Sequence, residues 1–369
     1  KDTEGLISTI KEYYYYIGEE KNGPYDKYGW PVFSPDGKTL AYTAEIDGKW
    51  YVIAGKEKAG PYDLCYDLAF SPDGKTLAYT AKIDGKWYVI AGKEKAGPYD
   101  ERVCPVFSPD GKTLAYLAII DGKNYVIAGK EKAGPYDFCS LPNFSPDGKT
   151  LAYTARIDGK WYVIAGKEKA GPYDLCSLPN FSPDGKTLAY TAVIDGKWYV
   201  IAGKEKAGPY AYDGCSVPNF SPDGKTLAYT AEIDGKWYVI AGKEKAGPYA
   251  YDLCYYPIFS PDGKTLAYTA KIDGKWYVIA GEEKAGPYDE HVWPVFLPDG
   301  KTLAYTAEID GKWYVVNGKE KAGPYDLCYN LTFSPDGKTL AYTAKIDGEL
   351  PSILMYEGNE YIGSICNNS

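Results

Sequence analysis

Apolar and polar segments alternate along the chain in an order that recurs. Around residues 30–63, the apolar segments TLAYTAEI (39–46) and KWYVIAG (49–55) are separated by Asp47 and Gly48 alone. Asp-Gly between two such segments is the strongest short-range signal for a β-hairpin. Both segments are apolar nearly throughout, as expected for strands of a sheet that packs on both faces. The pattern therefore predicts the two central strands of a buried sheet.

Two shorter segments flank this hairpin. WPVF (30–33) precedes it and leads into the turn SPDGK (34–38), where Pro fixes φ and Gly allows a positive φ. After the hairpin, KEK (56–58) is predicted to be a charged turn and AGPYD (59–63) a short outer strand. Most copies have a proline two places before the repeated Phe, which places the first strand at a sheet edge because proline cannot donate to the ladder. The unit is predicted to be a four-stranded sheet.

This unit occurs nine times, and we number the repeats 1 to 9 by their Phe: Phe33, Phe70, Phe107, Phe144, Phe181, Phe220, Phe259, Phe296 and Phe333. The period is 37 residues, except in two units of 39, where the segment GPYAYD at 208–213 and 247–252 contains an extra Ala-Tyr pair. A period near 40 without a helical pattern is typical of propeller blades. We predict an all-β, nine-bladed β-propeller of four-stranded antiparallel blades. It forms a single domain, 1–369, with repeats over about 11–348 and a degenerate segment at 349–369.

The chain ends allow two ways to close the ring. Residues 12–26 align with 49–63 and supply a third and a fourth strand, while 333–347 supply a first and a second. The favoured prediction combines them in one mixed N-/C-terminal blade, which removes an open sheet edge. The alternative uses SILMY (352–356) as the third strand of the last blade. Both give nine blades.

The segment FSPDGKTLAYTA, followed by DGKWYVI, occurs in register through the repeats. It resembles the WD-like propeller repeat in its Pro-Asp variant, the type found in the C-terminal domain of TolB. The resemblance implies the propeller fold, although nine copies exceed the usual number in that family. It indicates little about function, because the family contains binding proteins, peptidase-associated domains and many others.

Charge and cysteine usage limit the partners and the compartment. The net charge is −9 and the pI about 5.0, so no basic surface for nucleic acid or for a membrane is expected. Six of the eight cysteines lie five residues before the repeated Phe. Sheets packed face to face lie about 10 Å apart, too far for a disulfide, so we predict unpaired and mostly buried thiols. Unpaired thiols favour the cytoplasm, and a periplasmic or secreted location stays open if a signal was removed.

Motifs for catalysis are lacking in the sequence. His291 is the one histidine, and no GxSxG, GxGxxG or P-loop pattern occurs. The repeated SPDG and IDG aspartates are interpreted as turn residues. The sequence therefore predicts a monomer without enzymatic activity, cofactor or metal.

Variation between the copies is concentrated at two places: the six residues between the Asp of GPYD and the repeated Phe, and the residue before IDG. Because neighbouring strands run antiparallel, the two connections that carry these places emerge on one side of the sheet, which we call the top face. Residues that vary while the frame stays constant are typical of recognition loops. Neutral drift of duplicated repeats is the alternative explanation.

The predicted ligand-binding residues of the top face are small and polar on one side and aromatic on the other. The polar set comprises Ser140, Asn143, Ser177, Asn180, Ser216 and Asn219. The aromatic set comprises Tyr28, Trp30, Tyr66, Tyr255, Tyr256, Trp293 and Tyr329, and Arg102 and His291 add polar groups. The predicted rim comprises Glu45, Lys82, Arg156, Glu232, Lys271, Glu308 and Lys345. We expect a protein or peptide ligand. A glycan is the alternative ligand, and an engineered or recently amplified repeat protein without a specific ligand is a further alternative.

Overall fold

The computed structural model describes residues 12–368 with gaps at 18–19, 30–31, 212–214, 250–253, 291, 334–338, 346–351, 358–359 and 366. The described residues form strands, turns and bends. Each described repeat folds into an antiparallel sheet of four or five strands. The chain is therefore an all-β protein of repeated sheets, as the sequence predicts.

Repeat 1 shows how one unit is built. Its third and outer strands are joined by Gly55 and Lys56, and Glu57 pairs with Ala54 at the start of the outer strand. The predicted turn at 56–58 is therefore wrong in length, because this register needs a connection of two residues. The strands are β3 (Lys27–Tyr28), β4 (Val32–Phe33), β5 (Leu40–Ile46), β6 (Lys49–Ala54) and β7 (Glu57–Tyr62).

The same order of first, second, third and outer strand recurs along the chain. Repeats 2 and 3 form β8 (Leu64–Phe70), β9 (Leu77–Ile83), β10 (Lys86–Ala91), β11 (Glu94–Tyr99), β12 (Val106–Phe107), β13 (Leu114–Ile120), β14 (Lys123–Ala128) and β15 (Glu131–Tyr136). Repeats 4 and 5 form β16 (Phe138–Cys139), β17 (Asn143–Phe144), β18 (Leu151–Ile157), β19 (Lys160–Ala165), β20 (Glu168–Tyr173), β21 (Leu175–Cys176), β22 (Asn180–Phe181), β23 (Leu188–Ile194), β24 (Lys197–Ala202) and β25 (Glu205–Tyr210).

The second half of the chain continues this order. Repeats 6 and 7 form β26 (Asn219–Phe220), β27 (Leu227–Ile233), β28 (Lys236–Ala241), β29 (Glu244–Tyr249), β30 (Cys254–Phe259), β31 (Leu266–Ile272), β32 (Lys275–Ala280) and β33 (Glu283–Tyr288). Repeats 8 and 9 form β34 (Val295–Phe296), β35 (Leu303–Ile309), β36 (Lys312–Asn317), β37 (Glu320–Tyr325), β38 (Leu327–Phe333) and β39 (Thr339–Lys345), and the last sheet is completed by β40 (Ser352–Glu357) and β41 (Glu360–Ile365).

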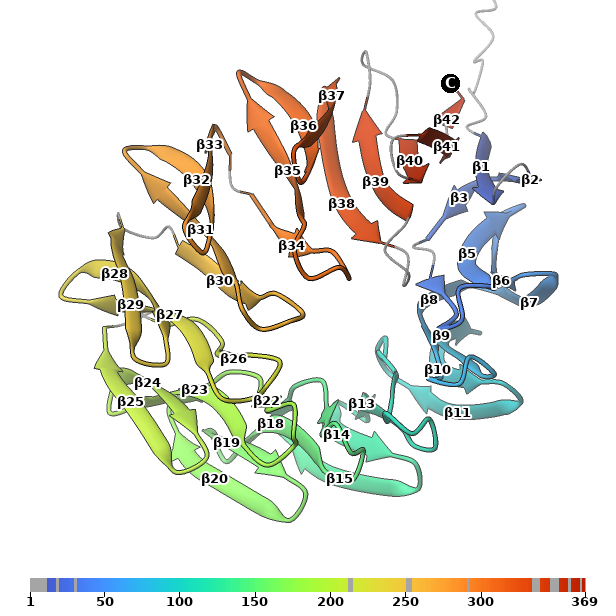
Figure 1. The fold of residues 1–369 in the computed structure, drawn as a ribbon. Coiled ribbons are helices and arrows are strands. Elements are labelled where there is room, and N and C mark those ends of the chain that lie inside the picture. The colour runs from blue at the N-terminus through green and yellow to red at the C-terminus, as the bar shows by residue number, and fades with distance from the viewer. Residues whose placement is uncertain are drawn as a thin grey trace, which may run out of the picture.

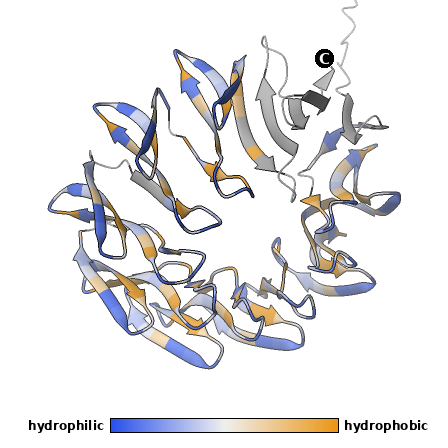
Figure 2. Ribbon diagram, viewed as in Figure 1, coloured by the Kyte–Doolittle hydropathy of each residue, from blue (hydrophilic) through white to orange (hydrophobic). Residues whose placement is uncertain are grey.

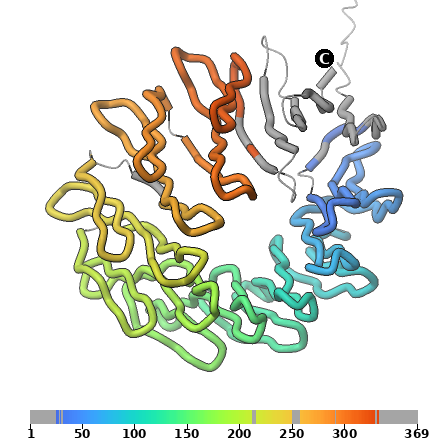
Figure 3. Tube along the Cα trace, viewed as in Figure 1, coloured from blue at the N-terminus to red at the C-terminus, as the bar shows by residue number. Residues whose placement is uncertain are grey.

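The sheets follow one another around a central opening, with the first strands nearer the opening than the outer strands (Figure 1). The trace from the first to the last repeat passes once around this opening (Figure 3). The two ends of the chain meet, because β1 (Glu12–Ile17) pairs with β42 (Asn367–Asn368). This arrangement is that of a β-propeller.

The strand pairing at the ends differs from the favoured prediction. The third strand of the last sheet is β40, which contains SILMY and pairs with β39, for example Thr343 with Ile353. Residues 12–25 instead form β1 and β2 (Glu20–Tyr25) in a separate three-stranded sheet with β42. A short connection between β39 and β40 costs less loop-closure entropy than pairing with the distant N-terminal segment.

Among the described residues, hydroxyl pairs between tyrosines join neighbouring sheets at several junctions. The Tyr62 hydroxyl on the outer strand of repeat 1 lies 2.8 Å from the Tyr79 hydroxyl on the second strand of repeat 2. The same pairing recurs at 2.8–2.9 Å at Tyr25–Tyr42, Tyr99–Tyr116, Tyr136–Tyr153, Tyr173–Tyr190, Tyr210–Tyr229, Tyr249–Tyr268 and Tyr288–Tyr305. Burial raises the pKa of Tyr79 above its ordinary value, so the hydroxyl stays protonated as the hydrogen bond requires.

The sheets pack through the apolar residues of their second and third strands. In repeat 1 these include Ala41, Tyr42, Ala44 and Val52, all buried. The hydrophobic segments lie along the inner strands, and the outer turns are hydrophilic (Figure 2). Small alanines on the second strand leave room for the tyrosines and so for close packing of neighbouring sheets.

The turns confirm the sequence interpretation of their aspartates. Asp47 and Gly48 both have positive φ, 52° and 71°, as a two-residue type I′ turn requires. In the SPDGK turn, the Asp36 carboxylate accepts a hydrogen bond from the Ser34 hydroxyl at 2.6 Å and one from the Lys38 N–H at 3.1 Å. These aspartates therefore stabilise turns.

The described cysteines are unpaired. Cys65, Cys139, Cys176 and Cys328 are buried and unpaired, and Cys104 and Cys215 are half-buried and unpaired, as predicted. No helix in the described part of the chain has the length and apolarity to cross a membrane. Within the same residues, no group of three or more His, Cys, Asp or Glu side chains is placed to hold a metal ion.

Candidate binding face

The two variable places lie side by side on one rim of each sheet. The strand pairing sets Lys27 opposite Glu45 in repeat 1 and Phe138 opposite Arg156 in repeat 4. Leu64 lies opposite Lys82 in the same way. The prediction that both variable stretches emerge on one face is confirmed by these pairings.

Constant residues of this face form links between neighbouring sheets. The Asp63 carboxylate accepts a hydrogen bond from the Gly85 N–H of the next repeat at 3.2 Å and one from the Lys49 ammonium of its own repeat at 3.4 Å. These two donors lower the pKa of the Asp63 carboxyl, the Gly85 N–H more strongly. The link explains why GPYD and IDGK stay fixed beside residues that vary.

The predicted serines belong to the frame of the sheets. The Ser140 N–H donates to the Thr154 carbonyl, and the Ser140 hydroxyl accepts from the Thr154 N–H, both at 2.9 Å. Ser177 and Ser216 make the same hydroxyl contact with Thr191 and Thr230. Each serine hydroxyl therefore accepts the hydrogen bond that a backbone carbonyl of the first strand would otherwise accept, at the point where this strand bulges away from the second. The hydroxyl is thus already used within the sheet.

Exposed apolar side chains lie one residue after these serines. Leu141 is 46% exposed, Leu178 51% and Val217 39%, and Trp293 occupies the same position in repeat 8 at 56%. Leu141, Leu178 and Val217 were not among the residues predicted from the sequence. The sequence nevertheless contained a signal for these three residues, because each lies between a serine that recurs in repeats 4 to 6 and the proline two places before the repeated Phe. We call Leu141, Leu178, Val217 and Trp293 the apolar arc.

The predicted asparagines follow on the same strands. Asn143 begins β17, opposite Ala152, and is exposed. Asn180 and Asn219 begin β22 and β26 and are half-buried. These amides lie two residues beyond the apolar arc along the first strand.

Repeats 2 and 3 bring a predicted tyrosine and arginine together. The Tyr66 ring lies between the rings of Trp50 and Trp87, with centroid distances of 5.9 and 6.2 Å. The Arg102 guanidinium lies 4.6 Å from the centre of the Tyr66 ring and donates to both carboxylate oxygens of Asp67. Tyr66 and Arg102 therefore form one cluster, whose charge is balanced by Asp67.

The predicted rim residues differ in their surroundings. Glu45 forms an ion pair with Lys27 at 2.8 Å, and Lys82 and Lys271 lie 5.8 and 5.6 Å from the rings of Trp87 and Trp276. The Arg156 side chain is exposed, whereas Glu232 and Glu308 are half-buried. Trp30 and His291 lie outside the described residues, as do the side chains of Tyr28, Tyr255, Tyr256, Tyr329 and Lys345.

Comparison with known proteins supports the fold. No family model matches the sequence, and no curated protein matches it. A solved structure described as a eukaryotic initiation factor has 12% identity and a TM-score of 0.52, covering 97% of this chain and 98% of its own. TolB from Agrobacterium tumefaciens has 20% identity and a TM-score of 0.32, covering 51% of this chain and 81% of its own. The chain is a β-propeller repeat protein.

The comparisons also correct the prediction that the chain is not an enzyme. An oligogalacturonate lyase in complex with manganese has 17% identity and a TM-score of 0.37, covering 68% of this chain and 87% of its own. A hydrazine synthase from Kuenenia stuttgartiensis has 17% identity and a TM-score of 0.35, covering 68% of this chain and 95% of its own. Enzymes therefore occur among its structural neighbours, and missing motifs do not exclude catalysis, since a fold does not determine chemistry. Distant neighbours likewise do not establish an enzymatic activity for this chain.

Proposed function

We propose that this propeller is a binding platform that recognises a protein or peptide through its top face. We further propose that it is a monomeric ring of nine blades of the Pro-Asp WD-like type. The observation that carries the binding proposal is the apolar arc. Three consecutive repeats expose an aliphatic side chain at one repeat position, while the neighbouring serine is engaged in the frame.

Aliphatic side chains exposed at one shared position suit an apolar ligand surface. Burial of apolar area contributes about 25 cal/mol per Å² on binding, before the costs of association are subtracted. Grouped exposed apolar residues on a soluble protein are typical of interaction sites. A protein or peptide with apolar side chains supplies the matching surface.

A glycan is the second candidate ligand. Asn143 in repeat 4 and Trp293 in repeat 8 are each exposed on this face, and an amide or an indole ring with a polar N–H can each contact a sugar separately. The aliphatic residues Leu141 and Leu178 favour the peptide over the glycan.

The test begins with a random dodecapeptide library displayed on phage and selected on the immobilised full chain. Selected peptides are then titrated against the wild type and against the triple variant Leu141→Ser, Leu178→Ser and Val217→Ser. We expect affinity to fall at least about tenfold, which corresponds to about 1.4 kcal/mol. Phe33→Ser is the matched control, because Phe33 is also exposed but pairs at the other end of its first strand.

Two results would contradict the proposal. One is a set of selected peptides that bind the triple variant as tightly as the wild type. The other is a library without binders together with positive signals on a glycan array that Trp293→Ala abolishes, which would favour the glycan.

A further inference from the structure

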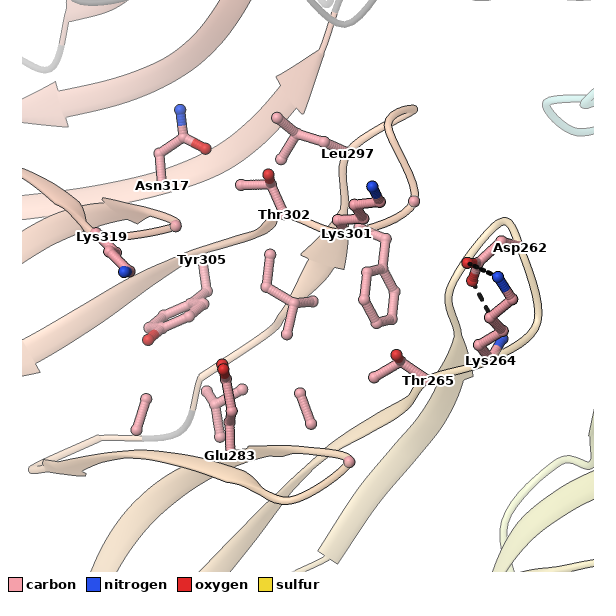
Figure 4. Close-up of a pocket in the computed structure, with 18 of the residues that line it drawn as sticks. Asp262, Lys264, Thr265, Glu283, Leu297, Lys301, Thr302, Tyr305, Asn317 and Lys319 are labelled. Carbon is pink, nitrogen blue, oxygen red and sulfur yellow. Dashed lines mark hydrogen bonds and ion pairs between the residues drawn. The ribbon is translucent and has the colours of Figure 1, made fainter.

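A cleft of about 940 Å³ lies between the sheets of repeats 7 and 8, on the side of the molecule opposite the top face. It is lined mainly by residues that the repeats share, among them Thr265 and Tyr305 (Figure 4). A cleft of about 570 Å³ between repeats 3 and 4 is lined by the matching Thr113 and Tyr153. Residues that recur in this way do not distinguish one repeat from another. Recognition at a single place on the ring therefore depends on the variable residues of the top face.

One variable position of the top face, the residue before IDG, is a cation in several repeats. Lys82 and Lys271 lie over the rings of Trp87 and Trp276, 5.8 and 5.6 Å from the ring centres. The Arg156 side chain is exposed, and among the described residues it has neither an ion pair nor a cation–π contact. Its positive charge is therefore available to a ligand.

Two aromatic rings explain why Arg156 differs from the lysines. The strand pairing sets Arg156 between Phe138 on the first strand and Trp161 on the third. The rings of Phe138 and Trp161 meet edge to face, with their centroids 5.4 Å apart. In repeat 2 a leucine stands in place of Phe138, and Lys82 lies over the Trp87 ring. The contact between the two rings therefore leaves the guanidinium without a ring partner.

Arginine is rare in this chain. Arg102 and Arg156 are the two arginines among the 41 Lys and Arg residues. Arg102 donates to both carboxylate oxygens of Asp67. The planar guanidinium makes this two-point contact with a carboxylate, whereas the ammonium of lysine acts as a point charge. Arg156 has the same donors, so a ligand carboxylate is the group that matches it.

Exposed apolar side chains extend from the apolar arc to Arg156. Phe138 is 48% exposed and lies three residues before Leu141. In repeat 5 the same pair recurs as Leu175, 40% exposed, and Leu178. Residues three apart on a strand lie at most about 10 Å apart, so an extended peptide of four residues spans the distance. A peptide that contacts the apolar arc therefore also reaches Arg156.

We propose that the peptide bound at the top face carries an acidic side chain next to an apolar one, and that Arg156 pairs with this carboxylate. This assignment rests on the function proposed above and names the class of its ligand. The apolar side chain packs against Phe138 and Leu141. Because the chain has a net charge of −9, an acidic ligand binds where a cation is available, so Arg156 fixes the place of the peptide on the ring.

The test uses peptides selected on the full chain and synthesised as C-terminal amides, so that carboxylates come from side chains. Each peptide is compared with its Asp→Asn or Glu→Gln form on the wild type and on Arg156→Val. Repeat 5 already has Val193 at this position, so the fold accommodates the change. On the wild type we expect loss of the carboxylate to lower the affinity about two- to fivefold, the range of an exposed ion pair. On Arg156→Val we expect no loss.

Equal losses on the two proteins would overturn the assignment, as would selected peptides that lack Asp and Glu. Lys82→Val is the matched control, because it removes a cation from the same position of repeat 2. It is expected to leave the affinity unchanged. Arg156→Glu recreates the residue present as Glu232 in repeat 6 and is expected to reverse the preference, so that a peptide with Lys in place of the acidic residue binds more tightly. The same loss in Lys82→Val as in Arg156→Val would show a general effect of charge and contradict the assignment.

A measurement without selected peptides separates this assignment from the function itself. N-acetyl-Leu-Asp amide and N-acetyl-Leu-Asn amide are titrated into the ¹⁵N-labelled full chain, and the two arginine Nε–H signals are followed by NMR. Arg156→Val identifies the Arg156 signal. We expect the Asp compound alone to shift this signal to saturation. Absence of that shift would overturn the assignment whatever the library yields.

The remaining outcomes distinguish the two proposals. Peptides that lose affinity on the triple variant of Leu141, Leu178 and Val217 but not on Arg156→Val would contradict the role of Arg156 alone. Peptides that are insensitive to the triple variant would contradict the proposed function.

Discussion

At the junction of repeats 2 and 3, Arg102 lies between the carboxylate of Asp67 and the ring of Tyr66. The Asp67 side chain is 15% exposed, and its backbone adopts a positive φ of 57°. A carboxylate that is this little exposed has lost much of its hydration, and the ion pair with Arg102 compensates for that loss. The arginine therefore stabilises the junction as well as contributing charge to the top face.

Removal of Arg102 tests this dependence. Arg102→Leu is expected to lower the free energy of unfolding by about 1 kcal/mol, because Asp67 then lacks its charge partner. Adding Asp67→Gly, which also suits the positive φ, is expected to recover most of the loss. Urea unfolding measures both variants, and equal stability of Arg102→Leu and the wild type would contradict the interpretation.

The serines of the first strands provide a second prediction at this scale. Ser140→Ala removes the acceptor of the Thr154 N–H and is expected to cost about 1–2 kcal/mol of unfolding free energy. Asn143→Ala is the matched control, because this side chain is exposed. Denaturant unfolding measures both, and a larger effect at Asn143 would show that Ser140 is not part of the frame.

At the scale of the elements, the outer strand depends on a glycine. Gly60 has a φ of 132°, and a Cβ atom there would lie 2.9 Å from the Trp50 carbonyl oxygen and 2.8 Å from the Tyr51 ring. A side chain at this position would therefore push the outer strand away from the third strand.

This close approach makes Gly60→Ala destabilising. The strained φ and the clash together are expected to cost about 1–3 kcal/mol, measured by chemical denaturation. Gly48→Asn is the control, because asparagine tolerates a positive φ and nothing lies within 4 Å of the added Cβ. A neutral Gly60→Ala would refute the argument.

The elements also show what the sequence could predict. The hairpin of β5 and β6 follows from Asp47 and Gly48, because its signal is local. The pairing of β1 with β42 did not follow, because it depends on which distant segments compete for a free edge. Likewise, the exposure of Leu141 beside the engaged Ser140 depends on a bulge in the first strand, which the sequence pattern does not locate.

For the whole molecule, the SPDGK turns contribute a common pH dependence. A serine hydroxyl donates to each of the carboxylates of Asp36, Asp73, Asp110, Asp147, Asp184, Asp223 and Asp262, and this bond lowers their pKa below the ordinary value of 3.8. A carboxyl group whose pKa is lower in the folded than in the unfolded protein stabilises the fold at pH values above its unfolded pKa. This stabilisation is lost as the pH falls through the pKa of the folded state.

The thermal midpoint is therefore expected to fall as the pH is lowered below 3.8. Scanning calorimetry between pH 2 and pH 6 measures this change. Ser145→Ala and Ser182→Ala together remove two of the hydroxyl donors, and the slope is expected to be shallower in this double variant. A midpoint that rises towards low pH would contradict the assignment.

The tyrosine link between repeats is chemically the same at each junction where it occurs. Such a junction does not distinguish the correct neighbour from any other copy, so covalent connectivity alone orders the blades. At the seam where Glu12 and Tyr13 pair with Asn368 and Asn367, the two strands come from opposite ends of the chain, so no short connection determines which strands pair. Exchange of blades between molecules would begin at that seam, where an interchangeable edge from a second chain can enter.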